Sequence, residues 1–148
     1  MTMTQFIQIL AGGVGSLGFA CLFHIRGQRL AVATFGGVLS WFLFVIFSYI
    51  IPSEPINYFL VSFLLTIFAE IMARVMKTPT TTFITPSLVP LIPGSSLYYT
   101  MAYGFQGDAT RFVTKGVATL SLAAALALGI IIATTLTKII VRKRNPAK

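Results

Sequence analysis

The stretch TPSLVPLIPGSSLYYTM, residues 85–101, combines residue types that could bind an anion inside a membrane. It is largely apolar, yet Pro86, Pro90 and Pro93 follow one another at short spacing and Gly94 comes next. A proline has no amide N–H, so the carbonyl four residues earlier loses its helical donor. A second helix starting beyond this point would present free N–H groups and the positive end of its dipole, which suits a carboxylate.

Two half-helices are predicted around this point. Thr78 before Pro79 has the pattern of a helix start, and Ser95 or Ser96 could cap a second helix beginning near Leu97. Discontinuous helices of this kind hold anionic or zwitterionic solutes in many secondary transporters. The alternative is a kink that only shapes packing, and Tyr98 and Tyr99 could equally belong to an outer aromatic belt. The candidate substrate-binding residues are Thr82, Pro86, Pro90, Pro93, Gly94, Ser95, Ser96, Tyr98 and Tyr99.

The breaks also leave three carbonyls without a helical donor, those of Thr82, Pro86 and Val89. In lipid, an unsatisfied backbone group is so costly that irregular backbone persists only against protein or a water-filled cavity. We therefore expect this segment to lie inside a bundle and not on its lipid face.

Glu70 and Arg74 form the second candidate for chemistry. They lie one helical turn apart, with the acid first, which is the favourable order for an ion pair. Glu70 is about six residues, or roughly 9 Å, from the end of its apolar run by helical rise. A carboxylate at that depth is a candidate coupling group, in contact with a proton or substrate. The alternative is an ion pair that anchors the helix end.

Other chemistry has little support in the sequence. There is no Ser-His-Asp candidate, no carboxylate pair and no phosphate-binding loop, so we expect no enzyme activity and no cofactor. Cys21 and His24 have no further ligands at metal spacing, so no metal site is expected. Transport would then be driven by a gradient or by an energised partner.

Composition places these residues in a membrane. Of 148 residues, 56% are hydrophobic and 9% are charged, which is too little polar surface for a soluble domain of this length. The net charge of +8 comes from short basic clusters between apolar runs, and no basic stripe alternates with aromatics. This distribution is typical of membrane orientation, and no nucleic-acid partner is expected.

The fold class predicted is all-α: a polytopic membrane helix bundle in a single transmembrane domain, residues 1–148. It has about five spans, the fourth broken at Pro86–Gly94. That fourth segment has 27 residues, about 40 Å as continuous helix against a hydrocarbon layer of about 30 Å. The surplus allows a central section to unwind. The spans are expected at about residues 6–23, 30–51, 57–76, 78–104 and 116–141.

The basic residues favour a topology with the N-terminus outside and the C-terminus in the cytoplasm. Five spans leave only Arg111 and Lys115 outside. A re-entrant fourth segment would instead leave six bases inside and five outside. The nine bases placed inside are Arg26, Arg29, Arg74, Lys77, Lys138, Arg142, Lys143, Arg144 and Lys148.

Small residues recur every fourth position in two of the runs. They are Gly12, Ser16 and Ala20 in the first run, and Ser121, Ala125, Gly129 and Ala133 in the last. This spacing lets helices approach closely in lipid. It serves packing within the chain or, alternatively, a homo-oligomer.

Three motifs carry a family resemblance: ITPSLVPLIPGSSLYYTM, the preceding AEIMARVMKTP, and GFACLFHIRGQRL at the end of the first run. With them the chain resembles the threonine/serine exporter family, in its short split-subunit (YjjB-like) form. The resemblance spans nearly the whole chain. The proline-glycine run with its tyrosines is its most specific part.

The resemblance implies a bacterial cytoplasmic (inner) membrane protein that works with a larger companion subunit. Fused members of the family export threonine and serine, and a split pair exports succinate, so the implied solute is a small carboxylated metabolite. An inverted-repeat arrangement of the two halves would fit an N-out second half. The alternative is a scaffold that stabilises a partner protein and transports nothing.

Overall fold

The computed structural model describes residues 3–144, and side chains through Val141, and this part of the chain is helical with short connections. The prediction of an all-α membrane helix bundle is confirmed. Lys148 and the side chains of Arg142, Lys143 and Arg144 lie outside the described residues. The elements in order are α1 (Met3–Leu22), α2 (Gln28–Ile50), α3 (Glu54–Val75), α4 (Thr81–Leu88), the 3₁₀ turn η1 (Val89–Leu91), α5 (Gly94–Phe105) and α6 (Ala109–Arg144).

Four of these helices, α1, α2, α3 and α6, are long and apolar enough to cross a membrane. Their bounds agree with four of the five expected runs to within a few residues, apart from α6, which starts at Ala109 where the expected span begins at residue 116. The expected fourth span corresponds to α4, η1 and α5 taken together. With 8 and 12 residues, neither α4 nor α5 reaches across a bilayer alone.

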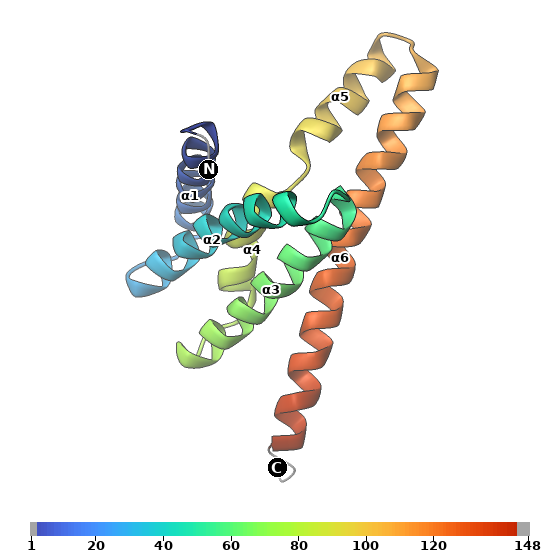
Figure 1. Ribbon diagram of the computed structural model, residues 1–148. Coiled ribbons are helices and arrows are strands. Elements are labelled where there is room, and N and C mark those ends of the chain that lie inside the picture. Colours follow the sequence, from blue (N-terminus) through green and yellow to red (C-terminus); the bar gives the residue numbers. More distant parts are fainter. Residues whose placement is uncertain (1–2, 145–148) are drawn as a thin grey trace.

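Helix α4 lies at the centre of the bundle, packed against α2, α3 and α1 (Figure 1). Its Phe83 is fully buried in a cluster with four alanines, Ala20, Ala33, Ala69 and Ala73. The small side chains of α1, α2 and α3 leave room for this one large ring. Close van der Waals contact of this ring with the surrounding helices is the kind of interaction that drives helix association in lipid. The short helix is therefore held by packing and not by its own length.

The other half of the broken segment is placed differently. Helix α5 packs along α6, and the two form a hairpin that extends away from the remaining helices (Figure 1). The hydroxyls of Thr100 and Thr119 meet between them at 3.2 Å. Helix α6 has 36 residues, about 54 Å by helical rise, so it runs the whole length of the molecule.

Helices α3 and α6 pack closely with their chains running in the same general direction (Figure 1). Gly129 of α6 lies against Ser62 of α3, and Thr66 and Ala133, each four residues further on, are fully buried. Continuing the same register by one more turn brings Glu70 of α3 to Thr137 of α6. The small-residue face predicted in the last run is thus an intramolecular contact with α3 at Gly129.

Candidate functional site

The interruption between Leu88 and Gly94 is the centre of the candidate site. The backbone passes from α4 through η1 to Ile92, which is extended with φ −61° and ψ 125°, and α5 begins two residues later. Two of the three carbonyls expected to lack donors have them: Val89 accepts from the Ile92 N–H at 3.3 Å, and Pro86 accepts from the Val89 N–H. The turn tightens from α to 3₁₀ geometry and recovers hydrogen bonds that the prolines removed.

The Pro86 carbonyl has a second donor from another helix. The hydroxyl of Ser16 on α1 donates to it at 2.8 Å, and both residues are buried. Space for this hydroxyl comes from α2, because a Cβ added at Gly37 would overlap Ser16 Oγ. Gly36 gives room to the hydroxyl of Ser87 in the same way. A diglycine on α2 therefore lets α1 reach the broken helix and satisfy its backbone.

We expect Ser16→Ala to lower the stability of the purified protein by about 1 kcal/mol, the usual size of a hydrogen bond between membrane helices. Thermal unfolding in detergent, followed by size-exclusion chromatography, measures the change. The matched control is Ser121→Ala, because the exposed Ser121 hydroxyl bonds within its own helix, to the Ala118 carbonyl at 2.7 Å. A larger loss for the control than for Ser16→Ala would contradict the role given to Ser16.

The start of α5 differs from the prediction in two respects. The helix begins at Gly94 and not near Leu97, and its N-cap is Pro93, without a side-chain capping bond from Ser95 or Ser96. Likewise α4 begins at Thr81 with Thr80 as its N-cap, and not at Pro79. Proline at position 93 already fixes the backbone for helix entry, so the serines lie inside the first turn.

The predicted substrate-binding residues fall into separate groups. Pro86 is buried, whereas Gly94 and Ser95 are exposed, and no atom would meet a Cβ added at Gly94 within 4 Å. Tyr98 and Tyr99 are exposed on α5, with their rings edge to face at 5.5 Å. The chain therefore does not enclose these residues in one cavity, and their part in binding stays a prediction.

Two pockets lie beside the broken segment. One, of about 330 Å³, is lined by Thr81, Thr82 and Thr85 of α4 together with Phe23 and Ile25. The other, of about 260 Å³, is lined by Pro90 of η1 and by four residues of α1 and α2: Gln8, Ala11, Gly12 and Trp41. Of these linings only Thr82 and Pro90 were predicted site residues. The other threonines were visible in the run TPTTTFITPS, but their partners came from a distant part of the sequence.

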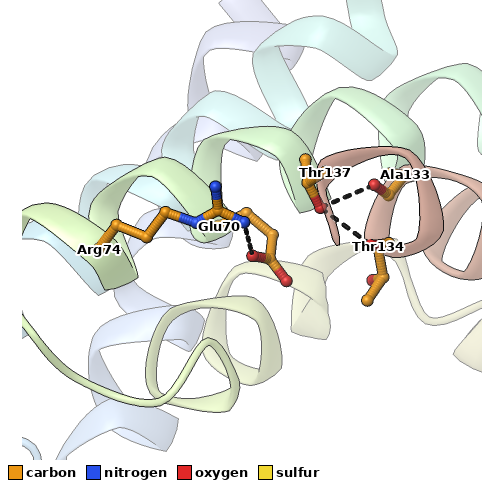
Figure 2. Close-up of polar contacts among 5 residues, drawn as sticks. All are labelled: Glu70, Arg74, Ala133, Thr134 and Thr137. Carbon is orange, nitrogen blue, oxygen red and sulfur yellow. Dashed lines mark hydrogen bonds and ion pairs between the residues drawn. The ribbon is translucent and has the colours of Figure 1, made fainter. Parts of the chain in front are cut away.

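Glu70 and Arg74 form the ion pair that their spacing suggested, with Arg74 Nη2 3.0 Å from Glu70 Oε2. The Glu70 side chain is 10% exposed and that of Arg74 is 44% exposed, so the acid is inside and the base reaches outward. Figure 2 shows the carboxylate beside the turn of α6 that carries Thr134 and Thr137. The Thr137 hydroxyl donates to the carbonyl of Ala133 or of Thr134. The carboxylate thus lies at the interface of two packed helices.

The described residues contain no group of three or more metal-ligating side chains. What the arrangement offers is a backbone interruption held by other helices, two adjacent pockets and one inward carboxylate. Such parts can bind and pass a small polar solute.

Comparison with known proteins gives one match. The sequence profile described as "Threonine/Serine exporter, ThrE" matches residues 8–136, from α1 into the last turns of α6. No curated protein and no solved structure matches the chain.

Proposed function

Because the chain belongs to the threonine/serine exporter family, we propose that it is a membrane subunit of a secondary exporter for small carboxylated metabolites. The solutes proposed are threonine and serine, or a C4-dicarboxylate such as succinate. The protein is a helical membrane protein, and its family is one of transporters. The observation that carries the proposal is the interrupted backbone between Leu88 and Gly94, since a plain scaffold helix gains nothing from such an interruption.

The proposed substrate contact is the first turn of α5. The N–H groups of Ser95 and Ser96 come too early in the helix to have an acceptor within it, and Gly94 and Ser95 are exposed, so a solute can reach this positive end of the helix dipole. A carboxylate placed there would receive these donors.

A larger companion subunit of the same family is proposed to complete the path. Among the described helices, α6 is the only one that α5 packs against extensively. The outer face of α5 carries large exposed side chains. These are Leu97, Tyr98, Met101 and Phe105, which are between 50% and 88% exposed. A companion bundle covering this face would enclose the start of α5. We place the pair in the bacterial cytoplasmic membrane with the N-terminus of this chain outside.

Reconstitution into liposomes tests the function. Efflux of labelled serine, threonine and succinate is followed with the chain alone, with the companion alone and with both. We expect solute efflux above the lipid leak only when both are present. Equal leak in all vesicles would leave the scaffold as the function of the chain.

Glu70 is proposed as the coupling group. Glu70→Gln keeps the shape and the contact with Arg74 but can neither gain nor lose a proton, so we expect efflux to lose most of its dependence on pH. The measurement is the initial efflux rate of the reconstituted pair at several internal and external pH values. The matched control is Asp108→Asn, because Asp108 also pairs with an arginine, Arg111, at 3.3 Å, but in an exposed turn. An unchanged pH profile in Glu70→Gln would make Glu70 a structural anchor.

A further inference from the structure

The threonines at the start of α4 differ from most other hydroxyl residues in the helices. Elsewhere, serine and threonine hydroxyls commonly donate to the carbonyl three or four residues earlier, as do those of Thr34, Thr66 and Thr119. The hydroxyls of Thr81, Thr82 and Thr85 make no hydrogen bond to any described residue. Just before them, Thr78 Oγ1 is buried and also has no partner. Thr81 and Thr85 are exposed and Thr82 is half-buried, so these hydroxyls are accessible to a solute.

These free hydroxyls open into one pocket. Residues 81, 82 and 85 lie close together around one turn, and all three line the pocket of about 330 Å³, which Phe23 and Ile25 of the connection after α1 also line. The volume falls at the lower end of the range of small-molecule sites. An apolar wall with a few convergent hydroxyls is the usual lining of such a site.

The charge around this pocket is positive. The connection that supplies Phe23 and Ile25 continues to Arg26 and then to Arg29 at the start of α2. These two arginines line a second pocket, of about 430 Å³, with Gln28, Val75 and Met76. The sequence has three acids. Glu70 and Asp108 are paired with arginines, and Glu54 lies at the opposite end of α3.

No carboxylate therefore lines either pocket to bind an ammonium group. A net anion is favoured here over a zwitterion, because two cations attract it and nothing repels it.

We infer that the pocket of Thr81, Thr82 and Thr85 is a binding site for a small carboxylate, which Arg26 and Arg29 collect from the same end of the bundle. The hydroxyls donate to the carboxylate oxygens, and the arginines raise its local concentration. The inference rests on the proposed function and gives the exporter a loading site separate from the first turn of α5. A lipid phosphate offers the same oxyanion chemistry, so the test separates the two sources.

Cysteine labelling tests the site without measuring transport. Thr85→Cys is made in a chain where the exposed Cys21 is replaced by alanine, and the protein is reconstituted with its companion in phosphatidylcholine vesicles. Two water-soluble methanethiosulfonates are compared, one with an anionic sulfonate and one with a cationic trimethylammonium group. Because a thiolate attracts a cationic reagent, each rate is first divided by the rate of the same reagent with a free thiol in solution. On that scale we expect the anionic reagent to react about tenfold faster than the cationic one. Combining Arg26→Gln with Arg29→Gln should remove this preference.

Protection by solute then identifies the ligand. We expect succinate to slow the labelling of the cysteine at position 85 in a concentration-dependent way, and serine at the same concentration to slow it less. The effect should persist when phosphatidylglycerol is added to the vesicles. The matched control is Thr135→Cys, since Thr135 is an exposed helical threonine whose hydroxyl is already bonded to the Ile131 carbonyl, and no protection is expected there.

Several results would overturn the inference. One is the absence of any reaction at position 85, and another is equal rates for the two reagents after division by their rates with a free thiol. A third is protection by phosphatidylglycerol with no effect of succinate, which would make this a lipid headgroup site. Thr82→Cys provides a second reporter if Thr85→Cys does not accumulate. If the pair exports solute but succinate does not slow the labelling, this site is wrong and the proposed transport stands. If succinate slows the labelling but the pair exports nothing, the proposed transport is wrong and the binding site stands.

Discussion

Replacing Gly129 with leucine is expected to prevent the folded protein from accumulating in the membrane. A Cβ at this position would overlap Ser62 Oγ and would lie 2.6 Å from the Phe59 carbonyl oxygen and 3.1 Å from the Phe63 amide nitrogen. Two of these three atoms belong to backbone, which cannot move aside as a side chain can. Helices α3 and α6 would have to separate along their whole contact, at a cost above about 3 kcal/mol.

The amount of protein in the membrane fraction and its elution as a single species in detergent measure this effect. Gly18→Leu is the matched control, because it makes the same change inside α1, where no atom lies within 4 Å of the added Cβ. Both substitutions gain helix propensity, so the difference between them reports the contact alone. Similar levels of the two variants would show that α3 and α6 do not pack as described.

The second large effect is expected from making the broken segment continuous. Alanine at positions 90, 93 and 94 replaces two prolines and a glycine, and at 90 and 93 it restores a backbone N–H. In a helix interior, alanine is more favourable than proline by about 3 kcal/mol and more favourable than glycine by about 1 kcal/mol. The new N–H at position 90 would donate to the Pro86 carbonyl, which Ser16 now reaches from α1. We expect α4 and α5 to join into one helix. The first-turn N–H groups of α5 would then donate to carbonyls of that helix and could no longer bind a solute, so efflux should be lost.

A control variant separates this effect from a general effect of removing prolines. Pro52 lies in the connection between α2 and α3, and Pro55 lies in the first turn of α3, so neither belongs to the broken segment. Alanine at both positions should leave efflux close to that of the unaltered chain. Thermal unfolding of both variants establishes that each is folded before efflux is compared.

Much of the fold follows from local sequence. Long apolar runs predict the membrane helices because each contains about enough residues to cross the hydrocarbon layer. The prolines likewise predict the interruption near residues 86–94, because each removes a donor wherever the rest of the chain lies. The helix starts were less accurate. Serines at 95 and 96 resemble caps, but Pro93 fixes the backbone earlier and α5 begins at Gly94.

The contacts that complete the candidate site could not be predicted in the same way. Ser16 and Pro86 are 70 residues apart, and their hydrogen bond depends on how α1 crosses α4 over Gly37. The sequence indicated that Ser16 belongs to a packing face, but not which carbonyl it meets. The pocket of Thr81, Thr82 and Thr85 depends equally on the connection between α1 and α2, which contributes Phe23 and Ile25.

Glu70 shows the same limit. Its spacing from Arg74 predicted the ion pair, because both lie on one helix. The turn of α6 beside it, with Thr134 and Thr137, follows only from the register of α3 against α6 (Figure 2). That register is set by Gly129, more than fifty residues beyond Glu70 in the sequence.

The most direct measurement of the central claim is the initial efflux rate of labelled serine, threonine and succinate from liposomes that contain the companion and either the unaltered chain or the variant with alanine at 90, 93 and 94. Both chains are reconstituted at equal amounts of folded protein. An interruption that serves transport predicts a rate in the variant no higher than the lipid leak, for every solute that the unaltered pair exports. An undiminished rate from a chain with a continuous helix through this segment would contradict it.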